Sequence, residues 1–350
     1  MDTHGLSRAP APDAAVFPPF VARAPWWGGD LQTLRSVLIR RHATLAEYPV
    51  ERLALPLDDG SGDRLLAVLN RPSREAVPAR PLVILVHGLT GLEDSFYLRN
   101  SAAHLLALGF PVLRLNLRGA GPSRPYCRFQ YHAGRSEDFA AALAALPPPL
   151  TAAGMVAVGY SLGGNMLLKY LGERGAAVPL RAAVSVSAPL DLAGTSRWMM
   201  RRRNALYQGY LLRAMRREAL APGAELSADE RAAIRDARSI WEFDHRFSAP
   251  RNGFAGAEDY YERNTARRFL DGIAVPTLVI YALDDPWIPA PAYLARDWRR
   301  NPNLVPLLPP SGGHVGFQGS DPRAAWHDRC IARFLPAVAP EGRPQREREQ

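Results

Sequence analysis

The sequence predicts an α/β protein with a mostly parallel central sheet, helices on both faces and a helical cap inserted late in the chain. Short apolar runs, typical of strands buried in a parallel sheet, alternate with amphipathic segments of helical spacing. Residues 154–175 combine a strand, a sharp turn and a helix, with Ser161 at the turn. Residues 191–270 interrupt the alternation with mainly helical segments. Strands alternating with helices indicate one sheet covered on both sides.

The composition indicates a soluble globular protein. The 350 residues are 47% hydrophobic and 22% charged, and no apolar run approaches the roughly 20 residues that a membrane span needs. The N-terminal residues do not show the basic start and apolar core of a secretory signal. Cys127 and Cys330 are the only cysteines, so we expect no disulfide framework, no cysteine metal cluster and a cytoplasmic location. The chemistry expected below implies no metal or organic cofactor.

The net charge of +9 and the isoelectric point near 9.9 raise the question of a nucleic-acid partner. Lys169 is the only lysine, and the arginines are spread along the chain, with clusters at 201–203 and 216–217. This distribution is more typical of a compositional bias than of a phosphate-binding surface. We therefore expect no nucleic-acid partner.

The expected organisation is a core in two parts with an insertion between them. Residues 1–16 are rich in Ala and Pro, and the charged residues 338–350 form a tail; both ends are expected to be disordered. Residues 17–190 and 271–337 form the core. Residues 191–270 form the cap, which would lie at the carboxyl edge of the sheet.

The first half of the core is expected to contribute the outer and central strands. Residues 17–41 are rich in aromatic side chains and are expected to pack on the core. Ser136 is expected to cap a helix that ends before residue 147. The other expected elements are a two-stranded hairpin at 51–69, a buried strand at 81–86, a helix at about 97–108 and a strand at 111–117.

The second half is expected to complete the sheet around the cap. Strands are predicted at 182–188, 275–282 and 304–308, and a closing helix at 326–335. Residues 198–220 are predicted to form one amphipathic helix with many arginines. We interpret it as part of a cap over an acyl pocket, and peripheral membrane contact of such a basic helix is the alternative.

Ser161 is the candidate nucleophile. It lies in Gly159-Tyr160-Ser161-Leu162-Gly163, between an apolar strand and a helix. Glycines at 159 and 163 are expected because neighbouring backbone approaches too closely for a Cβ in so tight a turn. A lone motif of this kind occurs by chance, but its position between a strand and a helix favours a nucleophile.

A serine hydroxyl needs a base, and the base needs an orienting acid. In sheets of this type the partners follow in the order serine, acid, histidine, each after a strand. The sequence offers Asp284 or Asp285, and then His314. We favour Asp285, which heads the run Asp-Pro-Trp-Ile-Pro. Two other histidines have different expected roles: His87 is expected to brace its own loop, and His245 in the cap could touch substrate.

The oxyanion of an acyl-transfer intermediate needs preorganised N–H donors. The backbone N–H of Leu162, directly after the candidate nucleophile, is the first expected donor. The loop His87-Gly88-Leu89-Thr90-Gly91 follows the strand at 81–86. The N–H of Leu89 in this loop is the second expected donor.

From about residue 17 to 337 the chain resembles the YheT-like hydrolases, an α/β-hydrolase family related to animal α/β-hydrolase-domain lipases. It departs from the family at Asp30, where the family carries a histidine. The matching segments are 31–33, 87–91, 159–165, 243–244, 253–254, 259–261, 283–286 and 313–317. Animal relatives carry an N-terminal membrane anchor, for which the first residues of this sequence contain no matching apolar stretch.

The resemblance implies a carboxylesterase that acts on short- to medium-chain esters, with monoacylglycerols among its possible substrates. The expected chemistry is that of a serine hydrolase with an acyl-enzyme intermediate. A thioesterase or acyltransferase with the same three residues is the alternative, followed by a non-catalytic binding protein on the same fold. Acyl-chain length, the alcohol and the oligomeric state stay open.

Overall fold

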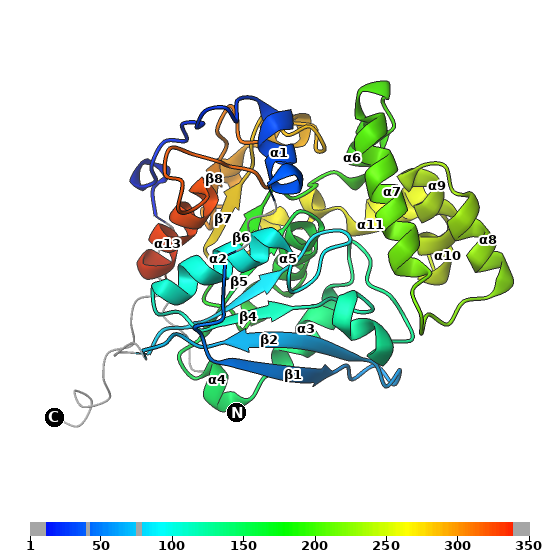
Figure 1. Ribbon diagram of the computed structural model, residues 1–350, viewed down its shortest axis with the longest axis horizontal. Coiled ribbons are helices and arrows are strands. Elements are labelled where there is room, and N and C mark those ends of the chain that lie inside the picture. Colours follow the sequence, from blue (N-terminus) through cyan, green and yellow to red (C-terminus); the bar gives the residue numbers. More distant parts are fainter. Residues whose placement is uncertain (1–11, 40–42, 75–78, 339–350) are drawn as a thin grey trace.

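The computed structural model describes residues 12–39, 43–74 and 79–338. Among them, eight strands form one sheet in the order β1-β2-β4-β3-β5-β6-β7-β8 (Figure 1). β1 pairs antiparallel with β2, and β2 antiparallel with β4, whereas all later pairings are parallel. The strands are Val50–Pro56 (β1), Arg64–Asn70 (β2), Leu82–Val86 (β3), Val112–Leu115 (β4), Met155–Tyr160 (β5), Ala182–Val186 (β6), Thr277–Ile280 (β7) and Leu304–Leu307 (β8).

Helices follow most strands and fill the insertion between β6 and β7. Those of the core are Gly29–Leu38 (α1), Phe96–Ala107 (α2), Ser136–Ala144 (α3), Pro148–Thr151 (α4), Leu162–Arg174 (α5), Pro291–Leu294 (α12) and Trp326–Val338 (α13). Those of the insertion are Leu192–Met199 (α6), Ala205–Ala219 (α7), Ala228–Asp236 (α8), Ile240–Phe243 (α9), Ala249–Arg251 (α10) and Ala257–Asn264 (α11), with a π-helical turn at Asp244–Ser248.

The two faces of the sheet are covered by different helices because successive side chains of a strand point to opposite faces. In β3, Leu82, Ile84 and Val86 pack in one buried cluster with residues of α3 and α5. Val83 and Leu85 pack in the other with residues of α2 and α13. The expected fold class, a mostly parallel sheet with helices on both faces, is confirmed.

The insertion has an apolar cluster of its own. Leu212 and Met215 of α7 pack with Ile234, Phe243 and Phe247 from the helices that follow. Figure 1 shows α7, α8, α9 and α10 grouped at one side of the sheet. The helical cap is therefore present, and it adjoins the edge where the parallel strands end.

The expectation of one helix over residues 198–220 was wrong. α6 ends at Met199 and α7 begins at Ala205, and Arg201 between them is extended, with φ −67° and ψ 146°. The Asn204 side chain donates to the carbonyl oxygen of Trp198 at 3.1 Å. This bond closes a turn that amphipathic spacing alone does not reveal.

The structure differs from two smaller expectations. Ser136 was expected at the N-cap, but it is the first residue of α3, and its hydroxyl donates to Glu173 at 2.6 Å instead. Within the N-terminal segment expected to be disordered, Ala14–Val16 forms a short 3₁₀ turn capped by Asp13. Residues 1–11 and 339–350 lie outside the described residues.

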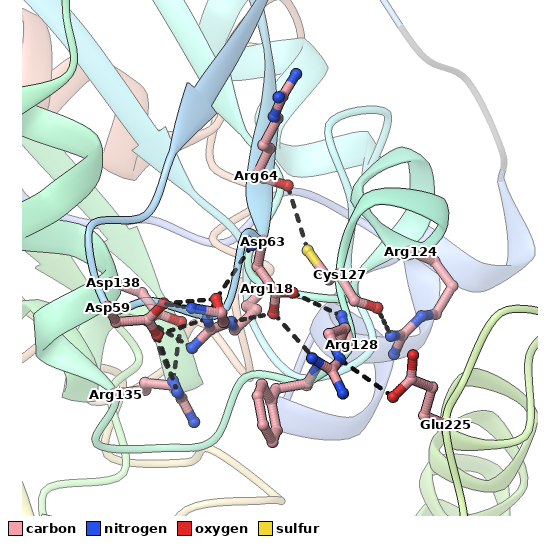
Figure 2. A network of polar contacts seen from close by, with 12 residues as sticks. Asp59, Asp63, Arg64, Arg118, Arg124, Cys127, Arg128, Arg135, Asp138 and Glu225 are labelled. Carbon is pink, nitrogen blue, oxygen red and sulfur yellow. Dashed lines mark hydrogen bonds and ion pairs between the residues drawn. The ribbon is translucent and has the colours of Figure 1, made fainter.

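A buried ionic cluster ties the β1–β2 hairpin to the core (Figure 2). Arg118, whose side chain is fully buried, forms ion pairs with Asp59 at 2.6 Å, Asp63 at 2.7 Å and Asp138 at 3.3 Å. Burial raises the pKa of Asp59, but hydrogen bonds from Ser61 and Arg118 outweigh this and hold it below its usual value. Arg135 also pairs with Asp138 at 3.0 Å and with Asp59 at 3.9 Å, so two cations compensate these three carboxylates.

Replacing Arg118 with methionine is expected to lower the free energy of unfolding by about 3–5 kcal/mol, because the buried carboxylate of Asp63 then loses its cation, while Asp59 and Asp138 keep Arg135. Urea unfolding followed by circular dichroism measures this. Arg299→Met is the matched control, since the Arg299 side chain is 91% exposed in its ion pair with Asp297, and little change is expected there. Equal stability of the two variants would contradict the prediction.

Candidate active site

Ser161 lies at the turn between β5 and α5, where its backbone has φ 51° and ψ −120°. This left-handed conformation is uncommon for a residue with a side chain. The turn is tight, because a Cβ added at Gly159 would lie 2.5 Å from the carbonyl oxygen of Gly163. A Cβ at Gly163 would lie 2.4 Å from the carbonyl oxygen of His87. The glycines thus permit the close approach that the sequence suggested.

The structure brings Ser161, His314 and Asp285 into one hydrogen-bonded chain. His314 Nε2 lies 3.0 Å from Ser161 Oγ, and His314 Nδ1 lies 2.8 Å from Asp285 Oδ2. The other carboxylate oxygen of Asp285 accepts from the backbone N–H groups of Trp287 and Ile288, at 2.8 and 3.1 Å. These bonds orient the carboxylate toward the imidazole.

Asp284 does not share the hydrogen bond that Asp285 makes with His314. Its Oδ1 accepts the backbone N–H of Gly313 at 2.9 Å. No contact between Asp284 and the His314 ring is found among the described residues. Of the two acids considered, only Asp285 touches the imidazole, and Asp284 holds the loop that carries it.

The N-terminal segment positions the His314 loop, a role that the sequence did not reveal. The Thr33 hydroxyl accepts the backbone N–H of His314 at 2.8 Å. The side chain of Gln32, which is fully buried, accepts the N–H of Gln318 at 2.6 Å. A Cβ at Gly313 would lie 2.5 Å from the carbonyl oxygen of Gly29. α1 thus packs directly against the histidine loop, which gives the matching segment 31–33 a structural role.

The loop at 87–91 lies against Ser161 and is held by two tyrosines. A Cβ at Gly88 would lie 2.9 Å from the Cβ of Ser161. Tyr97 accepts the N–H of Gly88 at 2.9 Å, and Tyr131 accepts the N–H of Thr90 at 2.7 Å. No hydrogen bond from the N–H of Leu89 or Leu162 is found in the described part of the chain. Both N–H groups are free to donate to a ligand.

His87 and His245 have contacts unlike those of His314. Burial lowers the pKa of His87 to about 4, so its ring is neutral. It accepts the N–H of Leu117 through Nε2 at 3.1 Å and contacts the carbonyl oxygen of Gly88 through Nδ1 at 2.7 Å, which braces its loop as expected. His245 stacks on Trp241 and does not line the cavity beside Ser161, so the structure gives no support to the suggestion that it could touch substrate, which stays a prediction.

A cavity of about 310 Å³ lies beside Ser161, between the sheet edge and the cap. Leu89, Leu162, Trp287 and His314 line it from the core. Its cap wall is mainly apolar, with Met199, Leu211, Met215, Ile240, Phe243 and Phe247. Such a cavity accepts an apolar group next to the serine hydroxyl.

Two acidic residues of the cavity wall were missed by the sequence analysis. Burial raises the pKa of Glu218 to about 7 and that of Asp244 to about 6. Each accepts a tyrosine hydroxyl, Tyr131 at 3.0 Å and Tyr261 at 2.8 Å. Asp244 belongs to the matching segment 243–244, to which no role was assigned. For Glu218 the signal was that it is the sole acid between Arg201 and Leu220. Through Tyr131, Glu218 also connects the cap to the loop that holds Leu89.

Comparisons with known proteins identify the family of the chain. The family model described as the alpha/beta hydrolase fold matches residues 81–318. The chain belongs to the α/β-hydrolase fold family. It is 35% identical to a protein of Escherichia coli named "Putative esterase YheT", over 83% of this chain and 84% of that one. The expected resemblance to YheT-like hydrolases is confirmed.

More distant relatives are lipases and esterases as well. The mouse phospholipase ABHD3 is 31% identical to this chain. The aligned region covers 75% of this chain and 65% of the mouse protein. An esterase of Pyrococcus furiosus superimposes with a TM-score of 0.59 at 16% identity, over 93% of this chain and 98% of that one, which supports the fold alone. The family membership and the named relatives place the chain among hydrolases of the esterase and lipase type.

Two further observations concern the described residues only. No three or more His, Cys, Asp or Glu side chains gather there in a way that could hold a metal ion. None of the helices in the described ranges is long and apolar enough to cross a bilayer.

Proposed function

We propose that the chain is a serine carboxylesterase that hydrolyses short- to medium-chain carboxylic esters, with monoacylglycerols among them, through an acyl-enzyme. The observation that carries this proposal is the chain of hydrogen bonds from Asp285 through His314 to Ser161 at 2.8 and 3.0 Å. It ends at a cavity with a mainly apolar cap wall. Nucleophile, base and orienting acid thus have the mutual geometry that acyl transfer requires.

In the first half of the reaction, His314 Nε2 takes the proton of Ser161 as Oγ attacks the ester carbonyl carbon. The carbonyl oxygen gains the negative charge and accepts hydrogen bonds from the N–H groups of Leu89 and Leu162. Asp285 stabilises the imidazolium through Nδ1–H. Collapse of the intermediate breaks the bond to the alcohol, which takes the proton from His314. The acyl group stays on Ser161.

In the second half, water replaces the alcohol. His314 takes a proton from that water, whose oxygen attacks the acyl carbon, and the same two N–H groups hold the second oxyanion. The proton returns from His314 to Ser161 Oγ as the carboxylic acid leaves. Each step uses groups that already lie in hydrogen-bonding order, so little reorganisation is required.

The size of the cavity supports short to medium acyl chains. A volume of about 310 Å³ lies at the lower end of the range of roughly 300–1,000 Å³ for small-molecule sites. Each methylene that enters an apolar wall contributes about 0.8 kcal/mol, or roughly a fourfold gain in transition-state binding. Catalytic efficiency should therefore rise with chain length until the cavity is full, and then fall.

A series of p-nitrophenyl esters of increasing acyl length tests the proposal. We expect kcat/KM to increase by up to about fourfold per methylene and to decline for long chains. Leu211→Phe, which narrows the cavity, should move the optimum to shorter chains. Leu206→Phe on the same helix is the matched control, because Leu206 is 88% exposed and does not line the cavity. An optimum that is identical in both variants would contradict the assignment of the cavity to the acyl chain.

Substrates with the same acyl chain distinguish an esterase from a thioesterase or an acyltransferase. A higher kcat/KM for thioesters than for oxygen esters of the same acyl chain would favour a thioesterase, and preferential transfer to an added alcohol would favour an acyltransferase. No labelling by a fluorophosphonate would favour a non-catalytic binding protein.

A further inference from the structure

We propose that the outer face of α7, together with the start of α1, docks on an anionic lipid surface and turns the entrance of the cavity toward it. This face, termed here the entrance face, consists of Trp27, Leu31, Arg201, Arg202, Arg203, Leu206, Tyr210, Arg213 and Arg217. The inference rests on the proposed function in one respect, since the surface would supply lipid esters to Ser161.

The first argument is the pattern of exposure along α7. Leu206, Tyr210, Arg213 and Arg217 are spaced by four, three and four residues and are all exposed, so they lie on one side of the helix. Leu206 is 88% exposed and Tyr210 is 55% exposed. The opposite side, with Leu212 and Met215, packs in the cap. α7 thus has an inner apolar side and an outer side that combines apolar and cationic groups.

The second argument is charge. All five arginines of the entrance face are exposed, and from Arg201 to Arg217 the sequence contains no Asp or Glu. The acid that follows, Glu218, points into the cavity wall. Asp30 on α1 is paired with Arg203 at 2.7 Å and with the Tyr207 hydroxyl at 2.9 Å. A net positive face complements anionic head groups, and each arginine near such a surface contributes to binding.

The third argument is continuity with the cavity. Tyr210 lines the cavity and is also more than half exposed, so it lies where the cavity meets solvent. Thr33 of α1 lines the same cavity. The contacts of Asp30 place the start of α1 beside the start of α7, where Trp27 and Leu31 add exposed apolar surface. A lipid held at this face would lie next to the entrance.

The arginines could bind either a nucleic acid or an anionic lipid surface, and the exposed apolar side chains beside them distinguish the two. A nucleic acid would pair with the guanidinium groups but would leave Leu206 and Leu31 without apolar contacts. A lipid interface buries apolar side chains while it neutralises the cations. The combination of both kinds of side chain on one face therefore favours lipid.

Co-flotation of Ser161→Ala protein with vesicles tests the proposal without turnover. The probes are phosphatidylcholine vesicles with and without phosphatidylglycerol. We expect binding to the anionic vesicles that weakens with salt. Adding Leu206→Glu should weaken binding about tenfold or more, and Arg213→Glu about fivefold or more. Val50→Glu and Arg299→Glu are the matched controls, because both residues are exposed outside the entrance face.

The outcomes separate this inference from the proposed function. Vesicle binding that Leu206→Glu weakens and Val50→Glu leaves intact supports the docking surface, even if no ester is hydrolysed. Absence of binding to anionic vesicles, or equal binding by both variants, overturns it. Retention on DNA without vesicle binding also overturns it and assigns the arginines to nucleic acid. With Ser161 intact, Leu206→Glu should retain full activity on a soluble p-nitrophenyl ester, because Leu206 does not line the cavity.

Discussion

Ser161→Ala is expected to reduce kcat for p-nitrophenyl ester hydrolysis by about 10⁴–10⁶-fold, the loss typical of removing the nucleophile from such a triad. The variant has no hydroxyl to form the acyl-enzyme, and water must attack the ester directly. KM should change little, because the walls of the cavity stay in place. Steady-state kinetics over the ester series, with fluorophosphonate labelling in parallel, measure both effects.

Ser196→Ala is the matched control for the loss of a hydroxyl. Ser196 lines the same cavity, but its hydroxyl lies 3.2 Å from the Tyr261 hydroxyl and is not part of the Asp285–His314–Ser161 chain. This variant should retain activity and labelling. Unchanged circular dichroism and thermal unfolding would show that both variants fold. Substantial activity in folded Ser161→Ala protein would refute the proposed nucleophile.

Asp285→Asn is expected to lower kcat by about 10⁴-fold, as happens when the orienting acid of a triad becomes an amide. An asparagine can present its N–H₂ group to His314 Nδ1, which favours the wrong tautomer of the imidazole. It also removes the negative charge that stabilises the imidazolium. The pH dependence of kcat/KM for the variant and the unaltered protein measures the change in the base.

Asp284→Asn is the adjacent control. Its side-chain oxygen can still accept the N–H of Gly313, the contact that Asp284 makes at 2.9 Å, so we expect less than about a tenfold loss, far below the effect of losing the orienting acid. The neighbouring substitutions have the same size and chemistry, and only one of them touches the imidazole. A larger loss for Asp284→Asn than for Asp285→Asn would reverse the assignment of the acid.

Local chemistry explains which parts of the site could be predicted. Ser161 lies in a motif whose glycines are required by the geometry of a single turn, and the strand and helix around it follow from hydrophobic spacing. The geometry that joins Ser161, Asp285 and His314 agrees with the prediction made for them, and their catalytic roles stay a prediction until they are tested. The sequence did not establish whether Asp284 or Asp285 orients His314, because two adjacent carboxylates differ only in what each contacts in the folded structure.

Other parts of the site had no local signal. Tyr131 and Glu218 come from a loop and from a cap helix, and they meet only because the cap packs over the loop at 87–91. Gln32 and Thr33 were recognised as a matching segment without a role, and the structure assigns them to the His314 loop. The break between α6 and α7 likewise depends on the Asn204–Trp198 hydrogen bond and on the contact of Arg203 with Asp30.

The sequence alone predicts the class of fold, the turn at Ser161 and the order of the candidate residues along the sheet edge. These properties depend on hydrophobic periodicity and on glycines near one another in the chain, so they can be read from neighbouring residues. The three-dimensional arrangement of the chain is needed to see which carboxylate faces His314, which groups hold the loops, and which side of α7 is exposed. These depend on contacts between segments far apart in the chain, and packing, not local preference, selects them.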